Sequence, residues 1–166
     1  MILRGPDSGA AALHARWMQM MSTQTPDPVQ QSFYYADVPM KRAVAWLFDT
    51  VLIAFLVALL IPLTGFLALF FLGGLYVVIS FLYRWIGLAR HSATIGMRLM
   101  GVEFRDGRGY RLGVAAGFAH TLMYALSVAF VVPQVISVLM ICFTRRGQSL
   151  SDVILGVVLV NRSALG

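Results

Sequence analysis

Three apolar stretches, each long enough to cross a bilayer, constrain this chain more than any other feature. The first covers residues 43–61, the second residues 66–83, and the third is a run of 32 residues, 112–143. A helix needs about 20 apolar residues to cross a hydrocarbon core about 30 Å thick. Because such a segment must satisfy its own backbone hydrogen bonds, we predict an all-α membrane fold, a polytopic bundle of three or four membrane helices.

The composition points to the same class. Of the 166 residues, 59% are hydrophobic and 12% are charged, and the mean hydropathy is +0.79. Soluble domains carry about 25% charged residues. The net charge of +6 does not indicate nucleic acid as a partner, because the basic residues lie beside the apolar runs. The expected partner is the lipid bilayer.

Basic residues also predict the orientation. Residues 84–111 hold six of the thirteen Lys and Arg residues, and Lys41 and Arg42 precede the first helix. Lys and Arg are retained on the cytoplasmic side of a membrane. We therefore expect a multi-pass membrane protein, with the N-terminus and both ends of the first hairpin cytoplasmic and the turn at Pro62 outside.

The third apolar run leaves two topologies open, because Pro133 interrupts it. One tilted helix would place Arg145 and Arg146 outside. A helix that ends near Phe130 and restarts at Pro133, where proline suits a first helical turn, would return the chain to the cytoplasm. We favour the return, although the second limb is short for a full crossing.

Two short segments have the composition of strands. Residues 101–105 are followed by the turn signal Asp106-Gly107-Arg108-Gly109, and residues 157–161 contain a run of Val and Leu. Neither is long enough to be stable alone. We expect them to pair as a small sheet at the cytoplasmic surface.

Asp49 lies in the middle of the first apolar run. A carboxylate at the bilayer centre costs about 2.5–3.5 kcal/mol, whereas the twelve Val, Leu, Ile and Phe residues of the run contribute roughly −4 to −7 kcal/mol in sum. Arg42 shares the helix face but lies about 10 Å away along the axis. Each side chain therefore needs another partner: Asp152 for Arg42, and for Asp49 one of Tyr76, Ser80, Arg84, His120 and Tyr124.

A small-residue face is predicted after the Arg-rich segment. Gly109, Gly113 and Gly117 form two overlapping G-x-x-x-G spacings, which let helices approach closely. His120 continues this face and is expected to hydrogen-bond between helices. We predict no metal site and no cofactor, since the three His and one Cys lack ligand spacing. Cys142, in the third apolar run, is expected to be a buried structural thiol.

Three segments together resemble the RDD family, small bacterial membrane proteins named for one Arg and two Asp. They are residues 41–49 (KRAVAWLFD), residues 94–102 (TIGMRLMGV) and residues 146–152 (RGQSLSD). The similarity spans roughly residues 38–162, which we take as the membrane domain, after a disordered tail at residues 1–37.

The resemblance implies roles for particular residues. Arg42 takes the place of the family's Arg, Asp49 that of its first Asp, and Asp152 that of its second Asp. The chain departs from the pattern at Met97, where Lys is common, and at Val157, where Thr is usual. The family's molecular role is largely undefined, with transport proposed.

Two functions remain open. The favoured one is a structural or accessory membrane component, in which the charged residues Arg42, Asp49 and Asp152 hold helices together. The alternative is a small transporter that moves a cation or a proton by way of Asp49, a default reading of ionisable residues in a membrane. Because three or four short helices are too few to enclose a transport pathway, we expect a homo-oligomer or a membrane partner. An enzyme is not expected, because no catalytic set is present.

Overall fold

The structure is a computed structural model, and it describes residues 26–64 and 67–165. These form six α-helices, two strands and three short 3-10 helices. They are η1 (Ser32–Tyr35), α2 (Val38–Leu63), η2 (Leu67–Phe71), α3 (Leu72–His91), α4 (Ile95–Leu99), β1 (Val102–Asp106), α5 (Val114–Ala129), α6 (Val131–Phe143), α7 (Leu150–Leu155), β2 (Val157–Asn161) and η3 (Arg162–Leu165).

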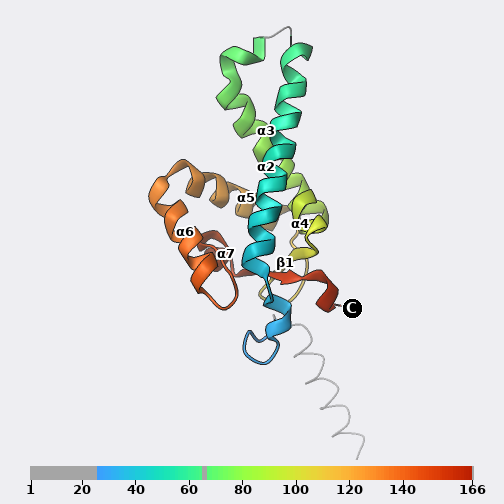
Figure 1. Ribbon diagram of the computed structural model, residues 1–166, viewed down its shortest axis with the longest axis vertical. Coiled ribbons are helices and arrows are strands. Elements are labelled where there is room, and N and C mark those ends of the chain that lie inside the picture. Colours follow the sequence, from blue (N-terminus) through green and yellow to red (C-terminus); the bar gives the residue numbers. More distant parts are fainter. Residues whose placement is uncertain (1–25, 65–66, 166) are drawn as a thin grey trace, which may run out of the picture.

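Helices α2 and α3 form a long hairpin that projects from the rest of the molecule (Figure 1). The 26 residues of α2 extend about 39 Å, which exceeds the hydrocarbon thickness of about 30 Å. The buried side chains of α2 recur every fourth residue from Ala45 to Val57, so they lie in one stripe. Most of the other apolar side chains of the hairpin are exposed, as a lipid-facing surface requires. Among the described residues, α2 and α3 are each long and apolar enough to cross a membrane.

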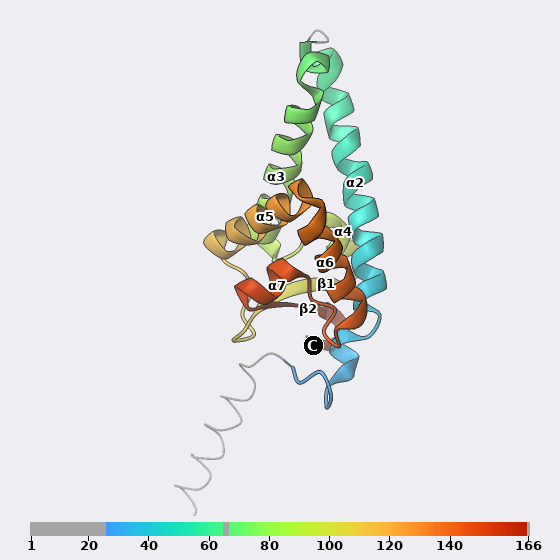
Figure 2. The same ribbon diagram turned by 90° about the vertical axis from the view of Figure 1, so that its left-hand side faces the viewer.

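Helices α5 and α6 form an arch against the lower half of this hairpin. They meet at Phe130, whose backbone is extended, and are bent by 115°. Figure 2 shows α5 crossing the hairpin and α6 turning back toward the sheet. Pro133 lies in the first turn of α6, where proline breaks no helical hydrogen bond. The predicted break is therefore present. The 13 residues of α6, about 20 Å, are too short to cross a membrane alone, whereas α5 and α6 together are long and apolar enough for a third, bent crossing.

The sheet lies at the base of the hairpin, which we call the sheet end. Strands β1 and β2 are antiparallel, with Val102 opposite Asn161 and Asp106 opposite Val157. The predicted pairing is thus confirmed, with the first strand starting one residue later than expected. Every residue of β2 is buried. Both faces of the sheet are covered, which explains why this strand is continuously apolar rather than alternating.

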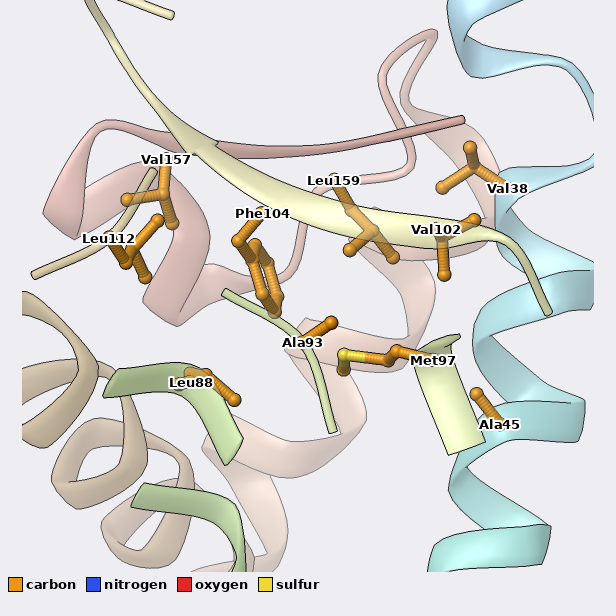
Figure 3. Close-up of a cluster of buried hydrophobic side chains, with 10 residues drawn as sticks. All are labelled: Val38, Ala45, Leu88, Ala93, Met97, Val102, Phe104, Leu112, Val157 and Leu159. Carbon is orange, nitrogen blue, oxygen red and sulfur yellow. The ribbon is translucent and has the colours of Figure 1, made fainter. Parts of the chain in front are cut away.

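The main core joins the sheet to the hairpin. In Figure 3, Phe104 projects from β1 toward Ala93, and Met97 of α4 lies between them and Ala45 of α2. Full burial of a side chain such as Phe104 contributes about 1.5–3 kcal/mol. The opposite face of the sheet packs on Tyr35 of η1. The sheet therefore fixes both the start of α2 and the end of α3.

Three expectations need correction. The first is the glycine face, of which only Gly117 packs against another helix: a Cβ there would lie 3.1 Å from the Ala89 nitrogen of α3. Gly109 occupies a turn at φ 82°. Gly113 is the N-cap of α5, with open space around it. The glycines belong to a turn, a cap and a helix rather than to one helical face. Cys142 is exposed rather than buried, because α6 packs along one side only and Ser137 is its one buried residue.

The tail predicted for residues 1–37 also extends too far. Tyr35 is buried against β2, and Asn161 donates hydrogen bonds of 3.0 Å to the carbonyl oxygens of both Phe33 and Ala36. Residues 1–25 of this expected tail lie outside the described residues.

Candidate functional site

The carboxylate of Asp49 is fully buried and is surrounded mainly by neutral donors. Its Oδ1 accepts from the Tyr83 hydroxyl at 2.5 Å and from the Gly96 backbone nitrogen at 2.9 Å. Its Oδ2 accepts from the Thr94 hydroxyl at 2.6 Å. The exposed fraction of Asp49 is 0%. Three hydrogen bonds thus compensate a group whose unpaired burial would be very costly.

The donors reach Asp49 because the chain reverses after α3. Ser92 ends α3 in the left-handed region, and Thr94 then caps α4 by accepting from the Met97 nitrogen. Gly96 brings the start of α4 against α2 so closely that a Cβ would lie 2.4 Å from the Ala45 carbonyl oxygen. The polar segment that follows the hairpin is therefore inserted against the helix that carries Asp49.

Arg84 is the nearest cation to Asp49, but it makes a loose contact. Its guanidinium nitrogen lies 4.0 Å from Asp49 Oδ2, and its guanidinium carbon lies 4.5 Å from the centre of the Tyr124 ring. The side chain is buried, and its Nε has no hydrogen-bond partner among the described residues. Stacking on an aromatic face stabilises a cation where water is excluded. Arg84 thus balances the charge of Asp49 without a direct hydrogen bond.

Asp152 is the second fully buried carboxylate, and it is held by an arginine and a histidine. Arg42 binds it in a bidentate manner, with Nη1 donating to Oδ2 at 2.5 Å and Nη2 donating to Oδ1 at 3.3 Å. His120 Nε2 lies 2.7 Å from Oδ1. Since an ionised carboxylate only accepts, this nitrogen carries the hydrogen. Asp152 also accepts from the Ser149 backbone nitrogen, which completes the capping box of α7.

These partners determine the charge state of Asp152. Burial acts to raise the pKa of its carboxyl, but the positive charge of Arg42 and the hydrogen bond from His120 outweigh burial and hold the pKa well below its ordinary range. The group is therefore ionised at any physiological pH. The ring of Phe104 packs beside the pair, 4.5 Å from the His120 ring and 5.5 Å from the Arg42 guanidinium carbon.

A small cavity separates the two carboxylate sites. It has a volume of about 50 Å³, and its lining includes Asp49, Arg84, His120 and Thr121. A water molecule needs roughly 10–15 Å³ of such space and two to four polar partners. The cavity is thus large and polar enough to hold a few waters between the sites. No group of three His, Cys, Asp or Glu side chains suited to a metal occurs in the described ranges.

The residues predicted from the sequence gather mainly at the Asp152 site and only in part at the Asp49 site. The structure brings Arg42, Asp152 and His120 together, as the sequence suggested for the first two. Asp49 is bound by Tyr83, Thr94 and Gly96, which were not among its expected partners. Of the expected partners, Arg84 lies 4.0 Å from it, and His120 and Tyr124 share a cavity with it without a hydrogen bond. Thr94 and Gly96 carried a usable signal, because a threonine before a short helix is a cap whose open backbone donors attract a carboxylate.

The geometry defines a helical membrane protein in which two buried carboxylates join the first helix to the segments that follow it. A comparison with protein families matches residues 36–156 to the RDD family. The match covers more than half of the chain, and the chain belongs to this family. No curated protein and no solved structure matches it.

Proposed function

We propose that this protein is a non-enzymatic structural or accessory component of the bacterial inner membrane. The observation that carries the proposal is the closed environment of Asp49, whose two oxygens are occupied by Tyr83, Thr94 and Gly96. A carrier must load and release its ion, whereas a group that receives donors from α3, α4 and the preceding loop joins these elements. Asp152 joins α2, α5 and α7 in the same way.

We further propose that the sheet end faces the cytoplasm and that the chain is multi-pass. Lys41 and Arg42 begin α2, and Arg145 and Arg146 follow α6, so basic residues concentrate at this end. A reporter fused after residue 166 tests the orientation. Activity of a cytoplasmic reporter is expected, and activity of a periplasmic reporter would contradict it.

A second candidate, a cation or proton carrier, is favoured by one observation. The cavity of about 50 Å³ between the two sites is lined by Asp49, Arg84 and His120, three ionisable groups that water could connect. The exposed apolar surface of the hairpin leaves room for the homo-oligomer or membrane partner that an enclosed pathway would require.

Ion flux in proteoliposomes separates the two functions. Asp49→Asn keeps Oδ1 for Tyr83 and Gly96, and the Thr94 hydroxyl can turn to accept, so this variant should accumulate nearly as wild type. The matched control is Asp37→Asn, at an exposed position. If the proposal holds, wild type and both variants show the background flux of empty liposomes. A pH-dependent cation flux that is lost only in Asp49→Asn, at unchanged protein level, would establish the carrier instead.

A further inference from the structure

A second and larger cavity lies beside the charged sites, between α2 and the arch. It has a volume of about 310 Å³, and α2, α5, α6 and the start of α7 form its walls. Val138 and Cys142 of α6 line it and are also exposed at the molecular surface. The cavity therefore opens onto the exposed apolar surface of α6. We call it the lateral cleft.

The lateral cleft contains polar groups that the protein itself does not satisfy. Ser137 Oγ lines it and is buried, with an exposed fraction of 4% for the residue, and it has no hydrogen-bond partner in the described part of the chain. A buried hydroxyl without a partner is destabilising, and a ligand that supplies an acceptor relieves this penalty. Gln134, one turn away on α6, uses its amide oxygen to accept from Ser127 at 3.0 Å, which directs its amide NH₂ group elsewhere.

The remaining polar lining is rich in donors. Tyr124 accepts from the Trp46 indole nitrogen at 2.9 Å, so its own hydroxyl hydrogen is available to a ligand. Arg42, which also binds Asp152, lines the cleft at the sheet end, and Arg145 and Arg146 follow the lining residue Cys142 by three and four positions. The hydrogen-bond donors and positive charges of the cleft favour a ligand that has acceptor oxygens and a negative charge. The apolar walls of the cleft favour a ligand that also has a hydrocarbon portion.

We propose that the lateral cleft binds one anionic phospholipid. The phosphate lies at the Arg42 end, an ester oxygen accepts from Ser137, and the acyl chains leave between α2 and α6 into the bilayer. The volume lies at the lower end of the range of about 300–1,000 Å³ found for small-molecule sites, so it suits the polar part and not the whole lipid. Basic pockets between membrane helices are known to bind anionic headgroups. This proposal does not depend on the structural role proposed above.

Cys142 provides a direct probe, since it is the single cysteine of the chain and lines the lateral cleft. The rate of its alkylation by a maleimide is measured in a neutral detergent, with added phosphatidylglycerol, phosphatidylcholine or inorganic phosphate. We expect phosphatidylglycerol alone to slow alkylation in a saturable manner. The control is Cys142→Ser with Leu139→Cys, which moves the thiol to an exposed position of α6 outside the cleft and should show no protection.

Two further variants test the residues. Ser137→Ala should weaken phosphatidylglycerol binding about fivefold, the effect of losing one hydrogen bond, whereas Ser80→Ala on α3 should leave it unchanged. Ala43→Phe should fill the cleft and abolish protection, with the elution profile of the detergent complex unchanged. Equal protection by phosphatidylcholine, protection by free phosphate alone, protection that appears only on dimerisation, or no protection of a monodisperse protein would each overturn the proposal.

Discussion

Asp49 and Asp152 are both completely buried, yet the chain compensates their charges by opposite means. Asp152 receives a bidentate arginine and a histidine. Asp49 receives a tyrosine, a threonine and a backbone nitrogen, and its nearest arginine nitrogen stays at 4.0 Å. One site depends on net charge and the other on the number and direction of neutral donors.

The difference follows from where each carboxylate lies. Asp152 belongs to a short helix beside the sheet, and the basic start of α2 lies next to it. Asp49 lies two turns deeper in α2, where a fixed cation in contact would have to be desolvated as well. Arg84 does bear this cost at 4.0 Å, with the Tyr124 ring as its partner, and the direct hydrogen bonds to Asp49 come from neutral donors. The comparison predicts that charge removal is most damaging at Asp152 and that shape and hydroxyl changes are most damaging at Asp49.

The largest effect is expected for Arg42→Ala, which leaves Asp152 buried with His120 as its remaining partner from another helix. Loss of one partner of a buried ion pair costs about 3–5 kcal/mol. Thermal unfolding of the detergent-solubilised protein measures this, with Arg90→Ala at an exposed position as the control. The double variant Arg42→Ala/Asp152→Ala should be less unstable than the sum of the single variants. Additive losses would show that the two side chains do not interact energetically.

A somewhat smaller effect, about 3 kcal/mol, is expected for Gly96→Ala, since overpacking typically costs about 1–3 kcal/mol and sometimes more. The new Cβ would lie 2.4 Å from the Ala45 carbonyl oxygen and 2.7 Å from Asp49 Oδ1, so α4 must move away from α2. Gly74→Ala is the matched control, because nothing lies within 4 Å of a Cβ there. Unfolding temperatures of the two variants should separate clearly. Equal stability would mean that α4 does not depend on this close approach.

Tyr83→Phe should cost about 1.5–3 kcal/mol, the usual contribution of a hydrogen bond to a charged group. The variant removes the donor to Asp49 and also the acceptor of the Ile95 nitrogen, while it preserves the ring. Tyr76→Phe, on the same helix and 38% exposed, should change stability little. The same unfolding assay decides the comparison, and a loss no greater than in Tyr76→Phe would argue against the Asp49 contact.

The smallest effect concerns pH. The folded-state pKa of Asp152 lies below its ordinary value of 3.8, so the stability gained from ionisation is fully present above that value and is lost as the pH falls further. We expect the stability difference between wild type and Asp152→Asn to stay constant from about pH 8 to about pH 5, and to shrink only in acid below the ordinary value. A difference that changed near neutral pH would contradict the assigned charge state.

Sequence patterns predicted the parts of this fold that depend on local rules. The paired strands, the break near Pro133 and the Arg42–Asp152 pair each follow from composition, proline chemistry or the balance of charge near a membrane. Helical spacing alone also indicated correctly that Arg42 does not reach Asp49. The signals for these features lie within single segments, although the residues that they join can be 110 positions apart.

The partners of Asp49 could not be predicted in this way. Spacing along α3 and α5 suggested Ser80 and His120, but Thr94 and Gly96 come from a chain reversal whose depth is set by packing of Met97 and Ala45 in the core. The prediction that Gly109, Gly113 and Gly117 share one helical face was wrong for a related reason. The isolated bridge between Arg105 and Arg111 keeps the chain extended before α5, so Gly109 and Gly113 never enter a helix.

The pairing of Arg42 with Asp152 can form only late in the synthesis of the chain. The two residues are 110 positions apart, and at about 5–20 residues per second a ribosome needs roughly 6–20 seconds to make the intervening chain. During that interval the first helix holds an arginine whose acceptor does not yet exist. A nascent chain that stops short of Asp152 therefore leaves the Arg42 guanidinium without its carboxylate partner.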